Sequence, residues 1–203
     1  MSDGAQTLAN ILSQPEIWRN AAGEWPRHAS ALERSQHVGG SRRLIFTGCG
    51  SAYYAAQTLA ATAAALRDVQ ALAVTASDAA LFPETIFSGG GQPTLIAISR
   101  SGQTSETIDA VRAFRRASAG PVLALTTTPG SALAQTADEV LDASAGAEAG
   151  IVQIRSLSTM LLLGLTALAH TAGERVSGPL ARLPDAAAQL LERARPLAQQ
   201  LGA

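Results

Sequence analysis

The sequence contains one cysteine, Cys49, among 203 residues. It can therefore form no intrachain disulfide and no zinc site built from cysteines, and we expect neither a metal nor a redox cofactor. Fifteen Lys and Arg residues nearly balance 16 Asp and Glu residues, which leaves a formal net charge of −1. This balance argues against a broad surface for nucleic acid or for an anionic membrane, although it leaves room for a local anion site.

Long apolar runs are also missing. The longest covers roughly residues 157–169, which is shorter than the ~20 residues that a membrane-spanning helix needs. The first ten residues, MSDGAQTLAN, lack the basic and apolar parts of a signal peptide. We therefore expect a cytoplasmic protein that does not contact membranes. Aromatic residues make up only 4%, so small side chains would let helices pack closely on a sheet.

The central part of the chain alternates between short apolar runs and helical segments. Such alternation predicts right-handed crossovers, a parallel sheet and helices on both of its faces. The fold class is therefore α/β, a three-layer α/β/α sandwich with a five-stranded parallel sheet. The five strands are expected at Arg43–Thr47, Gln70–Thr75, Thr94–Ser99, Pro121–Thr126 and Glu139–Ala143.

The two ends of the chain read differently from this centre. Residues 4–36 have apolar residues at helical spacing, and Pro15 and Pro26 predict that they form two or three separate helices. The glycines at the end of 37–40 predict a loop. A long apolar helix is expected from Gly150–Ile151 to His170, then a loop over 174–186 and a last helix with Asp185 as its N-cap. We divide the chain into N-terminal helices at 1–40, a main domain at 41–175 and a C-terminal segment at 176–203.

Two loops follow predicted strands and open predicted helices, at the edge where parallel sheets bind ligands. The first reads Gly48-Cys49-Gly50-Ser51 and the second Ser99-Arg100-Ser101-Gly102-Gln103-Thr104. Helix N-termini attract phosphate, glycines let the backbone approach it, and hydroxyl groups donate to it. Helix capping is the alternative role for these hydroxyls, but one cap accounts for only one of them.

A dinucleotide site is the rival interpretation of the first loop. In G-x-G-x-x-G the third glycine packs the helix against the strand, but Tyr53 stands at that position here. The second strand ends Val74-Thr75-Ala76-Ser77 and has no acidic residue to hold a ribose. Both departures argue against a nicotinamide cofactor.

Three segments carry a family resemblance: FTGCGSAYYAAQ, AISRSGQTSETIDAV and AGAEAGIVQIRSLSTMLL. They resemble the sugar isomerase (SIS) domain family, which has a flavodoxin-like fold. Within it they look most like the N-terminal SIS domain of glucosamine-6-phosphate synthases and AgaS-type ketose/aldose isomerases. The resemblance covers roughly residues 40–172.

The resemblance implies that the chain binds a phosphorylated sugar or aminosugar as part of a phosphosugar isomerase. By position, the residues that would hold the phosphate are Gly50, Ser51, Ser99, Arg100, Ser101, Gly102, Gln103 and Thr104. Ile151 and Gln153 would line the sugar, and Glu148 matches a glutamate that could act as the catalytic base. A carboxylate near a helix N-terminus is the alternative role for Glu148.

Two departures from the family pattern stand out. Arg100 replaces the more usual glutamine or glutamate, and Gln153-Ile154-Arg155 replaces a serine-threonine-lysine or serine-threonine-arginine run. Two-domain relatives also carry acid/base groups in a second SIS domain. We therefore expect this chain to complete its site as a homodimer or with a second SIS domain. The alternative function is a regulatory SIS domain that senses phosphosugars without catalysis.

Overall fold

The computed structural model describes residues 3–25, 28–29, 42–89, 91–172 and 177–201. Five parallel strands form one sheet in the order β2-β1-β3-β4-β5. The predicted fold class is thereby confirmed, and each strand lies within about a residue of its expected bounds. The strands are β1 (Arg43–Gly48), β2 (Gln70–Thr75), β3 (Thr94–Ile98), β4 (Val122–Thr126) and β5 (Glu139–Asp142).

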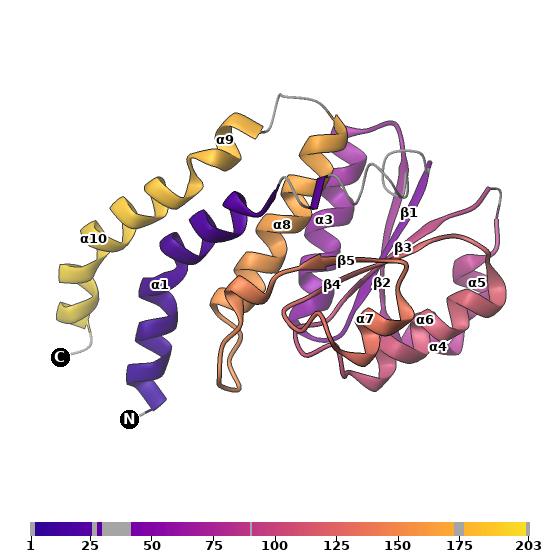
Figure 1. Ribbon diagram of the computed structural model, residues 1–203, viewed down its shortest axis with the longest axis horizontal. Helices are drawn as coiled ribbons and strands as arrows, with labels where there is room; N and C mark the ends of the chain where they lie inside the picture. Colours follow the sequence, from indigo (N-terminus) through magenta and orange to yellow (C-terminus); the bar gives the residue numbers. More distant parts are fainter. Residues whose placement is uncertain (1–2, 26–27, 30–41, 90, 173–176, 202–203) are drawn as a thin grey trace.

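Helices cover both faces of this sheet (Figure 1). Helices α3 (Ser51–Leu66) and α8 (Arg155–Ala172) pack on one face, where Leu44, Phe46 and Ile96 join their core cluster. The other face carries α4 (Ala76–Leu81), α5 (Pro83–Phe87), α6 (Ser105–Ala117) and α7 (Ala132–Thr136). Alternate residues, such as Ile45 and Leu95, point to this second cluster because successive strand side chains face opposite sides. The sequence reading had not anticipated α4 and α5.

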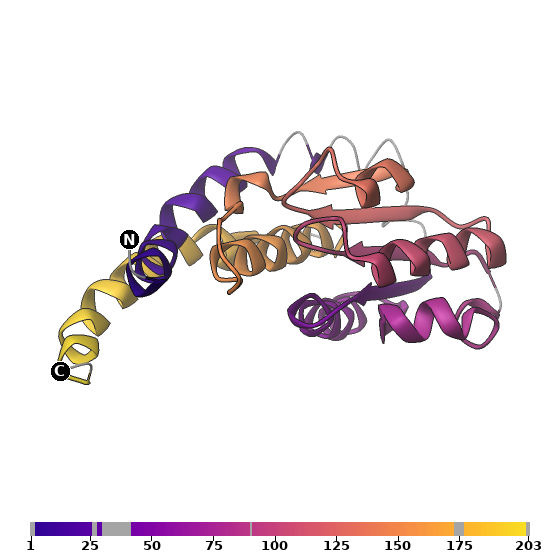
Figure 2. The same cartoon turned by 90° about the horizontal axis from the view of Figure 1, so that it is seen from below.

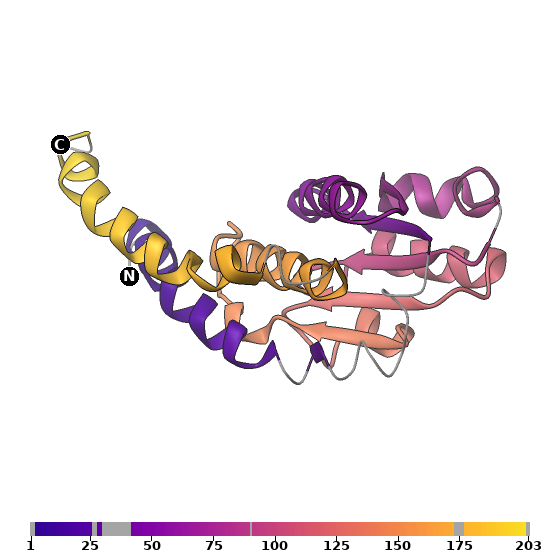
Figure 3. The same ribbon diagram turned by 90° about the horizontal axis from the view of Figure 1, so that it is seen from above.

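The N-terminal and C-terminal helices lie beside each other at one end of the molecule, away from the sheet (Figures 2 and 3). They are α1 (Asp3–Gly23) and α10 (Leu183–Leu201), which follows the short α9 (Ser177–Ala181). Arg19 of α1 pairs with Asp185 of α10 at 2.8 Å. Trp18 Nε1 donates to Ser158 Oγ of α8 at 3.1 Å, so α1 is held to the main domain as well.

Pro15 does not break α1, contrary to our expectation. It lies inside one 21-residue helix and is buried. Proline lacks the N–H that would bond the carbonyl four residues earlier, which here is that of Ile11. The side-chain amide of Gln14 donates to Ile11 O instead, at 3.3 Å, and so replaces the missing donor.

The start of α8 also differs from the prediction. The helix begins at Arg155 rather than at Gly150–Ile151, because Glu148 accepts hydrogen bonds from the backbone N–H groups of Ile154 and Arg155. This carboxylate caps the helix, and residues 147–154 form a loop between it and the 3-10 turn η1 (Ser144–Gly146).

The C-terminal prediction needs a similar correction. The expected loop at 174–186 contains α9 and the first turn of α10. Asp185 is therefore inside α10 and not its N-cap, because α10 begins at Leu183 with Pro184 in its first turn, where proline is well tolerated.

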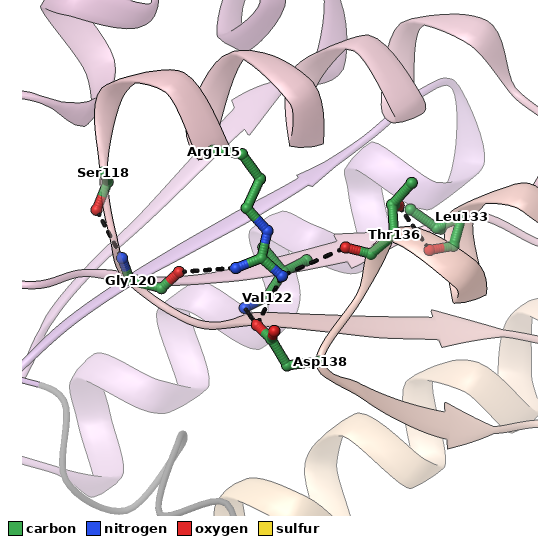
Figure 4. A network of polar contacts seen from close by, with 7 residues as sticks. All are labelled: Arg115, Ser118, Gly120, Val122, Leu133, Thr136 and Asp138. Atoms are coloured by element: carbon green, nitrogen blue, oxygen red, sulfur yellow. Dashed lines mark hydrogen bonds and ion pairs between the residues drawn. The ribbon is translucent and has the colours of Figure 1, made fainter.

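A cluster of polar contacts holds the amino ends of β4 and β5 (Figure 4). Arg115, in the last turn of α6, pairs with Asp138 at 2.7 Å and donates to the carbonyls of Gly120 and Thr136. Asp138 in turn accepts the N–H of Val122 at 2.7 Å. This Arg115 cluster fixes the helix and both strands at the edge opposite the loops that follow β1 and β3.

Some predictions concern residues outside the described ranges or are not tested by the fold. The loop predicted at 37–40 falls outside the described residues, as do other parts of the segment 1–40. The proposed three-part division of the chain stays a prediction. In the part of the chain that the structure describes, none of the helices has the length and apolarity to cross a membrane.

Candidate functional site

The candidate site lies where the carboxyl ends of β1 and β3 meet. These two strands are neighbours, with Gly48 paired to Ile98, although some 50 residues separate them in the sequence. From β1 the chain moves outward to β2, and from β3 it moves the other way to β4. Such a reversal leaves a crevice between the two loops that follow, which is where open α/β sheets bind ligands.

The loop after β3 is held by its own hydroxyl groups. Ser99 Oγ accepts the N–H of Gly102 at 3.2 Å and lies 3.1 Å from Thr104 Oγ1. Ser101 Oγ accepts the N–H of Gln103 at 3.2 Å. These contacts shape the loop before any ligand arrives, and preformed geometry lowers the cost of binding.

Glycine is required at two positions of the two loops. Gly102 has φ 61°, and a Cβ there would overlap the side chain of Ser131. Gly50 has φ 55° and is the N-cap residue of α3, without a side-chain capping bond. Positive φ values are readily adopted by glycine, so both turns depend on these residues.

Hydroxyl protons remain available for a ligand. In the Ser99–Thr104 pair either oxygen can donate to the other, and whichever accepts keeps its own proton free. Ser101 accepts from Gln103, so its proton is free too. Thr104 is the N-cap residue of α6 and makes no capping bond through its side chain. The alternative role as a helix cap therefore does not account for the hydroxyl of Thr104, whereas Ser99 and Ser101 each accept a backbone N–H within the loop.

A pocket of about 120 Å³ opens beside this loop. It is lined by one arginine and no acidic side chain, and the N-termini of α3 and α6 flank it, each with the positive end of its helix dipole. This combination suits an anion such as phosphate. The lining residues are Cys49, Ala52, Ile98, Ser99, Arg100, Ser101, Thr104 and Gln153.

Arg100 is held by hydrogen bonds to its backbone carbonyl, and its side chain contacts a second loop. Its carbonyl accepts Thr127 Oγ1 at 2.8 Å, Thr126 Oγ1 at 3.1 Å and the N–H of Thr127 at 3.2 Å. Its guanidinium donates to the carbonyl of Gly150 at 2.9 Å. The arginine thus joins the loop after β3 to the loop 147–154.

Glu148 is occupied as a helix cap in this structure. Its carboxylate accepts the N–H groups of Ile154, Arg155 and Ser156 and the hydroxyl of Ser156. Burial acts to raise the pKa of Glu148, but these hydrogen bonds favour the ionised form and together hold the pKa below its ordinary value. The carboxylate is charged at neutral pH, and a catalytic role for it stays a prediction.

The other expected site residues divide into two groups. Gln153 lines the pocket, and its Oε1 is buried without a hydrogen-bond partner within the described structure. Ser51, the first residue of α3, is half-buried but is not a lining residue, and Gln103 and Gly50 are exposed beside the pocket. Ile151 is 95% exposed on the loop 147–154, so this structure does not bring it onto the pocket wall.

Sequence reasoning missed several residues that support the site. Thr126 and Thr127 hold the carbonyl of Arg100, and Ser131 packs under Gly102. A run of three threonines directly after an apolar strand was the available signal, because hydroxyls at a strand end often bond neighbouring backbone. Cys49 also lines the pocket. Burial raises the pKa of its thiol, which keeps it protonated and unreactive.

Among the residues described, no three His, Cys, Asp or Glu side chains come together to hold a metal ion. The arrangement supplies a preformed loop, donor protons and a cation, all suited to binding an anionic group.

The chain is similar to known proteins over almost its whole length. The chain is 32% identical to the glutamine–fructose-6-phosphate aminotransferase (isomerizing) of Pyrobaculum aerophilum over an alignment 202 positions long, which covers 96% of this chain and 32% of that protein. It therefore spans about a third of the length of this relative. Similar shares, 28% and 33%, hold for the aminotransferases of the same name from Aeropyrum pernix and Pyrococcus horikoshii.

Solved structures share the fold. The tagatose-6-phosphate ketose/aldose isomerase of Escherichia coli superposes with a TM-score of 0.79 at 20% identity, over 92% of this chain and 52% of that one. The glucosamine-6-phosphate deaminase of Thermotoga maritima gives 0.75 at 21% identity, over 92% and 55%. The SIS domain model matches residues 39–170, which include both loops of the site and most of α8. On this match, the chain belongs to the SIS domain family.

Proposed function

We propose that this chain binds the phosphate group of a hexose 6-phosphate in the pocket beside Ser99, Ser101 and Thr104. The observation that carries the proposal is the pocket itself, a preformed loop with free hydroxyl protons, one cation and no acid on its wall. The names of the similar proteins from Pyrobaculum aerophilum, Thermotoga maritima and Escherichia coli support the sugar class, since each contains a hexose or hexosamine 6-phosphate.

In this proposal the phosphate is an anchor. The hydroxyls of Ser101 and of the Ser99–Thr104 pair donate to its oxygens, together with backbone N–H groups at the starts of α3 and α6. Ser51, Gly50, Gly102 and Gln103 complete the cradle as the resemblance implies. A fixed phosphate places C1 and C2 of the sugar at a set distance from the cradle, which reduces the entropy that a reaction there must lose.

The reaction we propose for the complete protein is the exchange of ketose and aldose. A base removes a proton from the carbon beside the carbonyl, which gives an enediol or enediolate. The proton is then delivered to the former carbonyl carbon, while a hydroxyl proton moves from one oxygen to the other. Glu148 is one candidate for the base. Its engagement as a cap favours the other candidate, a group from a partner subunit or a second SIS domain, and we propose a homodimer or a two-domain protein as the working unit.

One observation favours a second function. Because the pocket wall carries no acidic side chain, the chain as described is equipped to bind and lacks an obvious proton carrier. A regulatory domain that senses phosphosugars without converting them would need nothing more. An isomerase assay on the full-length protein separates the two functions.

Thermal unfolding tests the binding proposal. Fructose 6-phosphate and glucosamine 6-phosphate should each raise the melting temperature, whereas fructose and glucosamine should not. A ligand at 100 times its dissociation constant adds about 2.7 kcal/mol to the free energy of unfolding. Failure of both phosphosugars to stabilise the wild-type chain contradicts the proposal.

Two serine variants sharpen this test. Ser101→Ala removes one donor and should weaken binding about tenfold. Ser118→Ala is its matched control, because Ser118 Oγ also accepts the N–H two residues later, that of Gly120 at 3.0 Å, but lies at the far end of α6. Equal losses of binding in the two variants would show that stability, and not the cradle, is being measured.

A further inference from the structure

The loop 147–154 is held by several hydrogen bonds at its base, residues 147–148 and 154, and by a single described hydrogen bond at its tip, residues 150–153. At the base, Glu148 caps α8, and Arg155 donates from Nε and Nη2 to the carbonyl of Ala147. At the tip, Arg100 donates to the carbonyl of Gly150. Ile151 and Val152, which follow, are 95% and 62% exposed. The tip therefore presents apolar side chains to water. The hydrogen bond from Arg100 joins it to the loop 99–104, which is the proposed phosphate loop.

That arginine has a better partner when a ligand is present. Its bond to Gly150 joins a charged donor to a neutral carbonyl, whereas a sugar phosphate is an anion that a guanidinium can bind through two parallel hydrogen bonds. The guanidinium already lines the pocket. Its backbone cannot follow the ligand because three donors from Thr126 and Thr127 hold its carbonyl, so only the side chain is free to change partner.

Gln153 supplies a hydrogen-bond acceptor that a ligand could use. Its Oε1 is buried at the pocket wall without a hydrogen-bond partner in the described residues. A buried acceptor without a donor is costly, and a sugar hydroxyl or amino group would supply that donor.

We propose that Arg100 is a positioning residue that couples phosphate binding to the loop 147–154. When phosphate enters, the guanidinium leaves Gly150 for the phosphate oxygens, and the tip at 150–153 is freed to close over the sugar. Ile151 and Val152 then cover the ligand, and Gln153 Oε1 accepts from it. This inference rests on the proposed phosphate site.

Backbone NMR relaxation with inorganic phosphate as the probe separates the two halves of this sequence. Phosphate releases the tip but offers no sugar to close on, so the backbone order parameters of residues 151–153 should fall below about 0.6 when phosphate saturates the site. Fructose 6-phosphate should raise the order parameters of the same residues above the level of the free protein. Unchanged order parameters at 151–153 with phosphate demonstrably bound overturn the coupling.

Arginine variants complete the test. Arg100→Gln should bind phosphate about tenfold more weakly by calorimetry and should show low order parameters at 151–153 with and without phosphate. Arg112→Gln is the matched control, because it removes an equal charge from α6, where Arg112 pairs with exposed Asp109 at 3.0 Å. Wild-type phosphate affinity in Arg100→Gln would overturn the inference and leave the phosphate site intact. Absence of phosphate binding in the wild type would instead refute the proposed site, and the inference with it.

Discussion

Gly102 packs directly against the side chain of Ser131, with no room for a methyl group between them. The contact joins the phosphate loop to the start of α7, where Ser131 Oγ accepts the N–H of Ala134. The backbone supports it, since the N–H of Leu133 donates to the carbonyl of Gly102 at 2.9 Å. The loop after β3 is thus positioned by the loop after β4 as well as by its own hydroxyls.

Gly102→Ala should lower the free energy of unfolding by about 3 kcal/mol, from steric overlap together with a strained positive φ, and should abolish phosphosugar binding. Chemical denaturation and calorimetry measure the two effects. Adding Ser131→Gly should restore part of the stability because it removes the overlapping side chain. If the double variant is no more stable than Gly102→Ala alone, the contact is not the cause.

The Ser99–Thr104 pair should tolerate the loss of one hydroxyl. In Thr104→Val the proton of Ser99 has no competing acceptor at Thr104 and can go to the ligand, so phosphosugar affinity should fall by no more than about threefold. In Ser99→Ala with Thr104→Val, no proton is left and affinity should fall at least tenfold. Calorimetric titration of both proteins decides this, and a tenfold loss in Thr104→Val alone would contradict it.

Glu148 should make the stability depend on pH. Because its folded pKa is below the ordinary value of 4.5, its contribution is fully present above the unfolded pKa and is lost as pH falls through the folded pKa. Glu148→Gln should therefore cost about 1 kcal/mol of unfolding free energy at pH 7 and less at pH 3. Urea denaturation of both proteins over this range measures the difference.

The same variant tests the catalytic prediction for Glu148. If the carboxylate is only a cap, Glu148→Gln should retain phosphosugar binding and any isomerase activity of the complete protein. A loss of turnover with unchanged KM and preserved folding would identify it as the base after all.

The Arg115 cluster should matter for stability and not for binding. Arg115→Ala leaves the carbonyls of Gly120 and Thr136 without this donor. It also breaks the ion pair with Asp138, in which the Arg115 side chain is 36% exposed and the Asp138 side chain 38% exposed. We expect a loss of about 1–2 kcal/mol with unchanged phosphosugar affinity, because the cluster lies at the opposite edge of the sheet. Arg116→Ala, at the neighbouring exposed position of α6, is the control. A changed affinity in Arg115→Ala would show that the two edges communicate.

Much of the fold was predictable because its signals are local. Runs such as Leu44–Phe46 and Leu95–Ile98 are apolar throughout, as strands covered on both faces must be, and the glycine- and serine-rich loops after them marked the ligand edge. The strand bounds followed within about a residue. The order of the strands and the pocket wall depend on long-range pairing, which single segments do not encode.

The errors came from side-chain hydrogen bonds to the backbone, which hydrophobic periodicity and helix propensity do not describe. The position of Glu148 six residues before Ile154 gave no sign that it would delay the start of α8. The amide of Gln14 compensates for Pro15 in a way that helix propensity does not describe. The link from Arg100 to Gly150 joins residues 50 apart in the sequence, so it became visible only when the fold placed them together.

The neighbouring positions of β1 and β3 bear on how the chain folds. Between them it must form α3, β2, α4 and α5 and return, so the pairing of Gly48 with Ile98 closes a long loop of chain and is expected to form late. The two loops of the candidate site come together only when that pairing is complete. A phosphate ligand would then have affinity for the finished sheet and little for partly folded forms, so it would slow unfolding without speeding the earlier steps of folding.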